Sequence, residues 1–516
     1  MESPEQENPK ITELINEAEK INVIQMTDEG VKELISNLSQ KYKRNMDLRI
    51  KFQGNPEKFA DSEADLNAEL KNIQMITAYP DLLLSFVGCR GIDLLIDVLG
   101  HENTDIAIGV VSIFKELSEG DVILASRDNM QFIDYLISKD VLLLLIDTLE
   151  RLDLKRDEDL EGVYNILYTF VNISDYKTDI CDYYFNQDKL MKWLLLYVTS
   201  KDEKELNNAK LCACEILSII IEHSKDAKET LGQSKFFLEI FEEVHRRCTG
   251  EYESNEEYIN DLFNIICSCL LSEEGKETFR KYGGIKLMLE LMKCGLKTRR
   301  CALKVLDFAL SNMPASCKEF VNVLGLSFLF PIFMKKGYTR NGRLRVSESE
   351  LRKDEEYTIS LIWYLLKYCK GVDHDRVIYK FKEGNCEKVQ RLADMYEEYV
   401  DSYNNYLNAI ENVKDEKERE SIYIEETNNG LYTFQIITMV MGLLIIEKDE
   451  QIIGVLNDLI KSKRIRLDGM IKGIKEYLAH IENKEGSKEH EALQQILQTL
   501  EQSLSRESEG ETVKVD

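Results

Sequence analysis

The chain has 516 residues, a formal net charge of −27 at pH 7 and a hydrophobic fraction of 44%. Nucleic-acid backbones are bound chiefly by lysine and arginine, so this charge argues against direct nucleic-acid binding and favours a cationic protein partner. The chain contains only six prolines. Because proline breaks helix interiors, this scarcity indicates a nearly all-helical protein.

Neither secretion nor membrane insertion is expected. Residues 1–20 lack the apolar core segment of a signal peptide. The longest uncharged apolar run, 436–446, has eleven residues, whereas a helix needs about 20 to cross a bilayer, so this run predicts a buried helix. The twelve cysteines show no CxxC spacing, which is typical of reduced thiols in a cytosolic or nuclear protein.

The N-terminal part is predicted to contain a tail and a cap. Residues 1–30 carry eight acidic residues against two lysines, which predicts an acidic, disordered tail. A helical cap is expected over 31–90, because the terminal repeat of a solenoid has an open apolar edge that must be covered. Pro56 and Pro80 mark turns within this cap.

One pattern, a compact apolar helix followed by a longer amphipathic helix, recurs six times over 91–370. The first helices are predicted at 91–99, 141–149, 190–196, 236–241, 284–292 and 326–333, and the second near 105–117, 158–174, 208–222, 256–271, 298–312 and 355–369. The first helices start about 40 to 50 residues apart, the period of armadillo or HEAT repeats. The predicted fold is therefore all-α, an armadillo-type right-handed superhelical solenoid.

The repeat pattern is lost after Gly371. Long amphipathic helices are expected to form a C-terminal helical domain over 371–481, and an acidic tail with one helix near 492–504 is expected over 482–516.

The polar faces of the second helices are the first candidate site. In an armadillo superhelix these faces line the concave groove, so stacking would produce a ladder of carboxylates and amides. The ladder residues are Glu116, Asn165, Asn172, Glu215, Glu222, Asp261, Asn264 and Asp307. Carboxylates pair with lysine and arginine, and asparagine can hold a peptide backbone, so the ladder suits a basic linear segment. The alternative, a merely solvated helix face, stays open.

Two basic islands stand out against the acidic background. The first is a loop, expected to be exposed, with Lys335, Lys336, Arg340, Arg343 and Arg345. The second covers 461–466. Such clusters serve as nuclear-localisation patches, contact RNA or bind acidic partners, and they also occur as solvated loops.

No catalytic site, metal or cofactor is expected. The Cys-x-Cys pairs Cys212/Cys214 and Cys267/Cys269 lie in predicted helices, where residues two apart point to nearly opposite sides and cannot chelate one ion. The sequence contains no GxGxxG, P-loop or GxSxG motif. The chain is therefore predicted to bind without catalysing.

Several blocks of sequence resemble one family. They are LRIKF (48–52), NPEKF (55–59), LGHENTD (99–105), LERLD (149–153), ALKVLD (302–307), FVNVLGL (320–326) and FPIFMK (330–335). The chain resembles the family of beta-catenin-like protein 1, nuclear armadillo proteins associated with the spliceosome, over about 35–400 and more weakly to about 480. The resemblance implies binding to basic nuclear-localisation-type segments of splicing factors in the Nineteen-type complex, which contains a Myb-related splicing factor.

The leading hypothesis is thus a non-enzymatic nuclear scaffold for pre-mRNA splicing, and a homodimer is left open. One alternative is an import adaptor of the importin-alpha type. That class uses WxxxN arrays, whereas Trp193 and Trp363 are followed four residues later by Tyr197 and Lys367. Another alternative is a catenin-like signalling or junctional scaffold, whose basic groove takes acidic tails. The acidic ladder argues against it.

Overall fold

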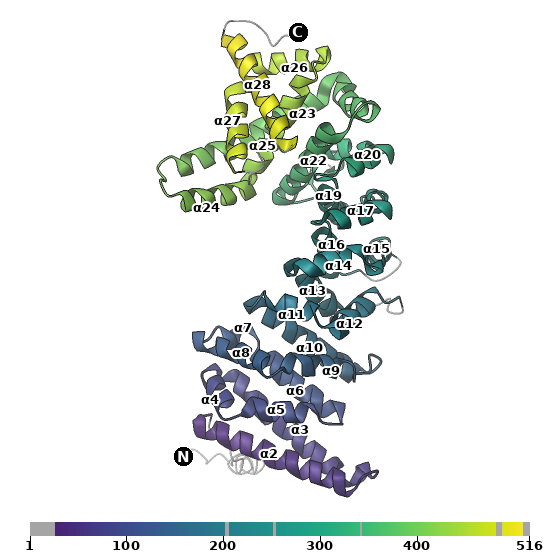
Figure 1. The fold of residues 1–516 in the computed structure, drawn as a ribbon, viewed down its shortest axis with the longest axis vertical. Helices are drawn as coiled ribbons and strands as arrows, with labels where there is room; N and C mark the ends of the chain where they lie inside the picture. Colours follow the sequence, from purple (N-terminus) through teal and green to yellow (C-terminus); the bar gives the residue numbers. More distant parts are fainter. Residues whose placement is uncertain (1–25, 202–205, 251–253, 341–342, 481–487, 509–516) are drawn as a thin grey trace, which may run out of the picture. The chain divides into compact units, whose positions relative to one another are not determined.

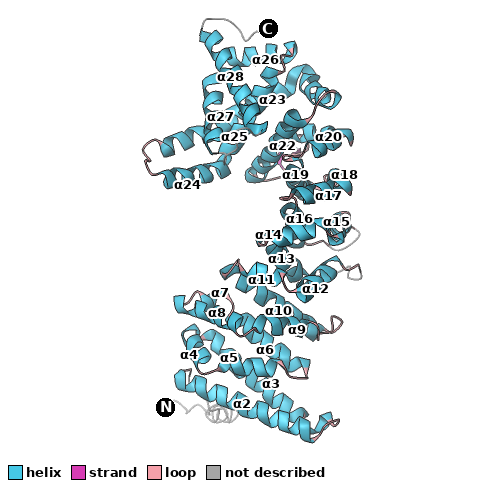
Figure 2. Cartoon of the chain, in the orientation of Figure 1, coloured by secondary structure: helices cyan, strands magenta, loops and turns pink. Residues whose placement is uncertain are grey.

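The structure is a computed structural model, and it describes residues 26–201, 206–250, 254–340, 343–480 and 488–508. These residues are almost entirely helical, which confirms the all-α prediction (Figures 1 and 2). Within the described ranges, strands occur only in a short hairpin of β1 (Thr339–Arg340) and β2 (Arg343–Leu344). Most of the predicted N-terminal tail lies outside the described residues.

The chain divides into two compact units, Met1–Ala227 and Lys228–Asp516. The boundary between the two units falls among the predicted repeats. It differs from the predicted segment bounds because the units are defined by the compactness of the fold, whereas the predicted segments were defined by the period of the sequence. Each unit is described by itself below.

The predicted helix pairs are present in both units. Unit 1 contains α5 (Gly91–Leu99) with α6 (Thr104–Leu117), α9 (Val141–Leu149) with α10 (Asp157–Tyr176), and α12 (Asp188–Thr199) with α13 (Asn208–His223). Unit 2 contains α15 (Lys235–Cys248) with α16 (Glu256–Cys269), α18 (Gly284–Leu291) with α19 (Leu296–Leu310), and α21 (Leu326–Phe333) with α22 (Glu348–Tyr368). The apolar periodicity of the sequence was therefore sufficient to find them.

Each pair is preceded by a short helix that the two-helix prediction missed. These helices are α4 (Leu83–Gly88), α8 (Met130–Ser138), α11 (Ile180–Phe185), α14 (Lys225–Gln233), α17 (Glu273–Lys281) and α20 (Pro314–Asn322). Helices of six to nine residues contain too few turns for a 3.6-residue period to show. The repeat is thus a three-helix unit.

In four of the six repeats, the turn from the short helix into the next helix uses left-handed backbone. Its residues with positive φ are Arg90, Asp140, Gly283 and Leu324. In three repeats a phenylalanine of the short helix packs against a glycine five residues later, as Phe86, Phe279 and Phe320 do against Gly91, Gly284 and Gly325. A β-carbon on these glycines would lie 2.2 to 2.5 Å from the ring, so this F-x4-G spacing is the sequence signal for the missed helix.

In unit 1 the third helices of the repeats stack in the order α6, α10, α13. The cap helices α2 (Asp28–Lys51) and α3 (Ala60–Gln74) pack together, and α3 covers the outer side of α6. Leu66, Leu70 and Ile73 of α3 are buried there. The remaining short elements are η1 (Pro56–Lys58), η2 (Met75–Ala78), η3 (Pro80–Leu82), α7 (Gly120–Ile123) and η4 (Arg127–Asn129).

In unit 2 the stack runs through α16, α19 and α22 and continues into α25 (Tyr432–Ile446) and α28 (Lys488–Ser508). The loss of the repeat pattern after Gly371 therefore does not end the stacking. The other elements are α23 (Val372–Ile410, bent at 383–386), α24 (Glu416–Glu426), the π-helical η5 (Thr427–Leu431), α26 (Glu450–Lys461) and α27 (Leu467–His480).

Helix α25 contains the long apolar run. By length and composition, the described residues offer the segment 416–446, and a bent pair formed by α20 and α21, as stretches that could cross a membrane. In the fold, 78% of the apolar window of 416–446 is buried. The prediction of a buried core helix is confirmed.

Helix α28 lies in the segment predicted as an acidic tail, near the predicted 492–504 helix. Its side chains Leu493, Ile496 and Leu500 are buried. Gly442 of α25 allows the close approach, because a β-carbon there would lie 2.3 Å from Ile496. This packing makes α28 part of the core of unit 2.

We expect Ile496→Ala to lower the free energy of unfolding by about 2–4 kcal/mol, because it removes a buried side chain and leaves a cavity. Gln498→Ala, on the exposed side of α28, serves as the control and should change it by less than about 0.5 kcal/mol. Urea unfolding measures both. Equal stabilities of the two variants would contradict the packing of α28.

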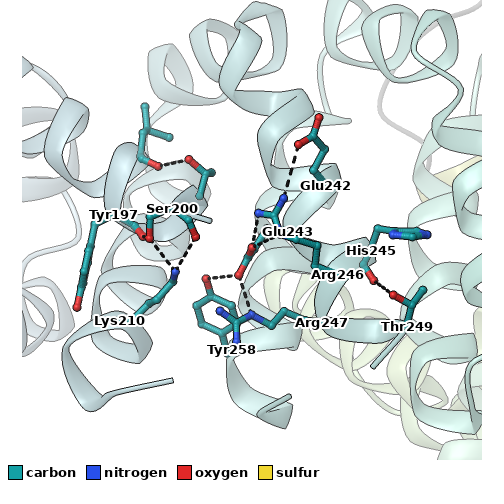
Figure 3. A network of polar contacts seen from close by, with 12 residues as sticks. Tyr197, Ser200, Lys210, Glu242, Glu243, His245, Arg246, Arg247, Thr249 and Tyr258 are labelled. Carbon is teal, nitrogen blue, oxygen red and sulfur yellow. Dashed lines mark hydrogen bonds and ion pairs between the residues drawn. The ribbon is translucent and has the colours of Figure 1, made fainter. Parts of the chain in front are cut away.

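A buried ion network holds α15 against α16 (Figure 3). Glu243, with 0% of its surface exposed, accepts hydrogen bonds from Arg246 Nη2 at 2.5 Å, Arg247 Nε at 2.8 Å and Tyr258 Oη at 3.2 Å. The Arg247 guanidinium also lies 5.5 Å from the centre of the Tyr258 ring. Because both carboxylate oxygens are bonded inside the fold, this network is structural.

A second buried cation, Lys210, belongs to unit 1 and is also drawn in Figure 3. Its Nζ donates to the Ser200 carbonyl oxygen at 3.2 Å and to Ser200 Oγ at 3.0 Å. Tyr197 Oη donates to Asn207 Oδ1 at 3.2 Å. These bonds fix the end of α12 against the start of α13.

Glu243→Ala should lower the free energy of unfolding by about 3–5 kcal/mol, because it leaves two buried guanidinium groups without their carboxylate. Tyr258→Phe removes one hydrogen bond and should cost only about 1 kcal/mol. Guanidinium-induced unfolding of the two variants and the parent chain measures the difference. A loss below 1 kcal/mol for Glu243→Ala would contradict the network's structural role.

Candidate functional site

A groove of about 480 Å³ lies across α3, α6 and α10 in unit 1. It is lined mainly by polar side chains of these three helices. The lining residues are Asn67, Leu70, Lys71, Gln74, Asp105, Ile108, Gly109, Ser112, Glu158, Glu161 and Asn165.

Helix periodicity explains why these residues share one surface. Residues three or four positions apart lie on one face of a helix. The lining residues of α6 have this spacing: Asp105, Ile108, Gly109 and Ser112. Gly109 forms the floor, because a β-carbon there would lie 3.2 Å from Leu70 of α3. The small residue therefore lets α3 and α6 approach closely while their polar faces remain open.

The groove is acidic. Its lining residues include three carboxylates and one lysine, and all four are exposed: Asp105, Glu158, Glu161 and Lys71. Asp105 pairs with Arg156 at 3.3 Å, but both side chains are about half exposed, and such pairs contribute little. Glu158 and Glu161 are thus the groove's principal cation-attracting groups.

The structure places the three predicted ladder residues of the α6 and α10 helices in three different environments. Asn165 lines the groove. The Glu116 carboxylate is hydrogen-bonded to Gln74 and Thr77. Asn172, only 8% exposed, donates to Ser118 Oγ at 3.1 Å and therefore joins α10 to the end of α6.

On α13, Glu215 is half-buried and Glu222 is exposed. Neither lines the acidic groove.

In unit 2, Asp261 and Asn264 lie half-buried on α16. Asn264 Oδ1 accepts a hydrogen bond from Lys304 Nζ at 3.0 Å, so this amide oxygen already has a partner within the fold.

Asp307 of α19 differs most from its predicted position on an open face. Its Oδ1 is buried and has no hydrogen-bond partner among the residues that the structure describes. Burial, together with the nearby Glu356 carboxylate, raises the pKa of the carboxyl group to about 8, while Lys276 opposes both effects. The Lys276 ammonium donates to the Ser311 carbonyl oxygen at 2.6 Å. Asp307 is therefore a half-buried acid with one carboxylate oxygen shielded from solvent, and it does not lie on an open face.

Asp307→Asn should flatten the pH dependence of stability. The carboxyl group ionises near pH 3.8 when free and near pH 8 in the fold, so between these values the folded chain holds the extra proton. Stability then falls as pH rises, by up to about 1.4 kcal/mol per pH unit, and asparagine has no proton to lose. Urea unfolding at pH 5 and pH 8 measures this, with the exposed Glu290→Gln as control. The same pH dependence in Asp307→Asn and the parent would contradict the assignment.

The first basic island forms the β1–β2 hairpin and its flanks. Lys335 is paired with Glu355 at 2.9 Å and Glu398 at 3.3 Å. Lys336, Arg343 and Arg345 are exposed, while the side chain of Arg340 lies outside the described residues.

The two arginines of the second basic island are paired within the fold, while its two lysines, Lys461 and Lys463, are exposed. Arg464 bonds to Glu397 at 2.9 Å and Asp394 at 2.7 Å, and Arg466 pairs with Asp468 at 2.9 Å. These arginines hold the turn before α27 in place.

The Cys-x-Cys pairs are buried. Burial raises the pKa of the Cys267 thiol to about 12 and that of Cys269 well above its ordinary range. Such thiols stay protonated, which disfavours metal binding and nucleophilic chemistry. In the described part of the chain, no group of three or more His, Cys, Asp or Glu side chains is placed to hold a metal ion.

Part of the groove was missed from the sequence. Asn67, Lys71 and Gln74 of α3 line it, although the sequence assigned this helix only a capping role. The signal was present, because these residues alternate along α3 with the buried Leu70 and Ile73.

Stacked three-helix repeats with a polar groove along their third helices define an armadillo-type solenoid, a class of protein-interaction scaffold that is generally non-catalytic. The family described as catenin-beta-like, Arm-motif containing nuclear proteins matches residues 9–475. The chain belongs to this family, which confirms the resemblance and the nuclear localisation.

Two relatives are called beta-catenin-like protein 1 and its homolog. The human protein is 30% identical over 81% of this chain and 76% of its own length. The fission yeast Schizosaccharomyces pombe homolog is 27% identical over 89% of this chain and 80% of its own length. An engineered protein of known structure aligns at a TM-score of 0.48 and 11% identity over 92% of this chain and 99% of its own length, a similarity too low to decide the fold by itself.

Proposed function

We propose that this protein is a scaffold of the pre-mRNA splicing machinery that binds basic, nuclear-localisation-type segments of splicing factors. The observation that carries this proposal is the acidic groove across α3, α6 and α10. A lysine-rich segment lying along it would bring its ammonium groups to Glu158 and Glu161.

The polar, uncharged side chains of the groove suit an extended peptide backbone. Asn67 and Gln74 line the groove with the carboxylates and are half-buried, and amide side chains can donate to and accept from peptide groups. A segment without regular secondary structure would thus find both backbone and side-chain partners. The family's nuclear character supports splicing factors, including a Myb-related one of the Nineteen-type complex, as the source of this segment.

The alternative functions have weaker support. An importin-alpha-type adaptor needs exposed tryptophans along its groove, whereas Trp363 is 1% exposed. A junctional catenin that takes acidic tails needs a basic groove, and the unit 1 groove carries a surplus of carboxylates.

Charge reversal in the groove tests peptide binding. Glu158→Lys with Glu161→Lys should weaken binding of a fluorescein-labelled Lys-Lys-Arg-Lys peptide by about tenfold or more, because attraction becomes repulsion. Fluorescence anisotropy measures the affinity, and circular dichroism checks that helicity is unchanged. Glu290→Lys, an exposed charge reversal on α18 outside the groove, should leave the affinity within about twofold.

A pull-down from nuclear extract tests the splicing role. The parent chain should recover splicing factors, and the groove variant should lose those that carry basic segments. Unchanged peptide affinity in the groove variant, or no splicing factor retained by the parent chain, would overturn the proposal.

A further inference from the structure

A second surface, in unit 2, combines an apolar hollow with a basic pocket. The hollow, of about 520 Å³, lies where α23 begins beside the turn between α20 and α21. Leu324, Val372 and Tyr379 line it and are 62%, 75% and 62% exposed. Large apolar side chains this exposed, gathered in one hollow, mark an interaction site.

Leu324 is unusual in its backbone as well as its exposure. Its φ of 66° is left-handed, a conformation that a leucine adopts only at a cost. The same turn in other repeats uses Arg90, Asp140 or Gly283. At Leu324 the strained backbone presents an apolar side chain to solvent, and only a bound apolar group would cover it.

The charged rim of the hollow consists of Asp375, Arg376, Lys380 and Glu383, and three of these four side chains are paired within the fold. Lys380 bonds to Glu383 at 2.8 Å, and Arg376 lies 3.7 Å from Asp373. The Asp375 carboxylate is exposed, so the hollow offers a ligand apolar surface with one carboxylate at its rim.

The basic pocket, of about 550 Å³, lies between α20, the end of α22 and the start of α23, and its charged lining residues are Lys318, Lys367, Lys370 and Asp373. Lys318 and Lys370 are exposed, and neither forms an ion pair with any residue that the structure describes. This contrasts with Lys335 and Arg464, whose charges are neutralised by neighbouring carboxylates. In a chain of net charge −27, such unpaired lysines form a site that favours anions.

The two hollows lie along one seam. Arg376 of α23 approaches Asn322 Oδ1 of α20 at 3.5 Å, and Lys370 and Val372 are two residues apart. Helix α20 has nine residues and is thus about 13 Å long, with Lys318 within it and Leu324 in the turn after it. One short segment of a partner can therefore reach both hollows.

We propose that this surface binds an amphipathic acidic segment of a partner protein. Apolar side chains of the segment cover Leu324, Val372 and Tyr379, and its carboxylates pair with Lys318 and Lys370. The site is separate from the acidic groove of unit 1 and selects a ligand of opposite charge.

The test uses the full chain and a fluorescein-labelled peptide of about 15 residues, ~22 Å long as a helix, with leucines on one face and glutamates at one end. Leu324→Gly with Tyr379→Ala should weaken binding by about tenfold or more, because apolar contact area is lost. Lys318→Glu with Lys370→Glu should weaken it by about fivefold or more at low salt, and this difference should shrink as salt rises.

Matched controls separate this site from general effects. Leu271→Ala, which removes another exposed leucine, and Lys286→Glu, on the exposed side of α18, should leave the affinity unchanged. Binding of the basic peptide to the unit 1 groove should also survive all these changes, so failure here is distinct from failure of the proposed function.

Two results would overturn the proposal. One is equal or tighter binding of a peptide in which every glutamate is replaced by lysine. The other is unchanged affinity in either double variant while circular dichroism shows the parent's helicity.

Discussion

The structure depends on one constraint: no single repeat can bury the apolar faces of its own helices. The third helices therefore stack on one another, in the order α6, α10, α13 in unit 1 and α16, α19, α22 in unit 2. Each helix buries one face between its neighbours and leaves a narrow strip open. What this strip carries determines what the protein can bind.

Stacking also decides which polar residues remain available. In unit 1 the open strip keeps Glu158 and Glu161 exposed, while Asn172, nearer the end of the same helix, is drawn into a bond with Ser118. In unit 2 the neighbouring helices close over Asp307 and raise its pKa. Where the neighbouring helices leave the polar face exposed, its residues are available to a ligand. Where the neighbouring helices cover it, its residues form contacts within the fold.

This difference explains how much of the protein could be predicted from its sequence. The helices and the all-α class follow from apolar periodicity, which is local in the chain. The depth of a polar residue depends on the partner helix, so the sequence placed Asp307 and the exposed Glu222 on equivalent faces. The short helices were missed because they span too few turns, although the spacing of Phe320 and Gly325 marked one of them.

Charge pairing between neighbouring helices accounts for the rest of the surface. Many arginines and lysines of this acidic chain pair with carboxylates, as Arg464 does with Glu397, so a run of basic residues in the sequence is a poor guide to a basic surface. Lys318 and Lys370 are far apart from any such run, yet the fold places both in one pocket. The cationic site in this protein thus arises because the fold gathers three lysines around a single carboxylate, that of Asp373, an arrangement that only the three-dimensional structure reveals.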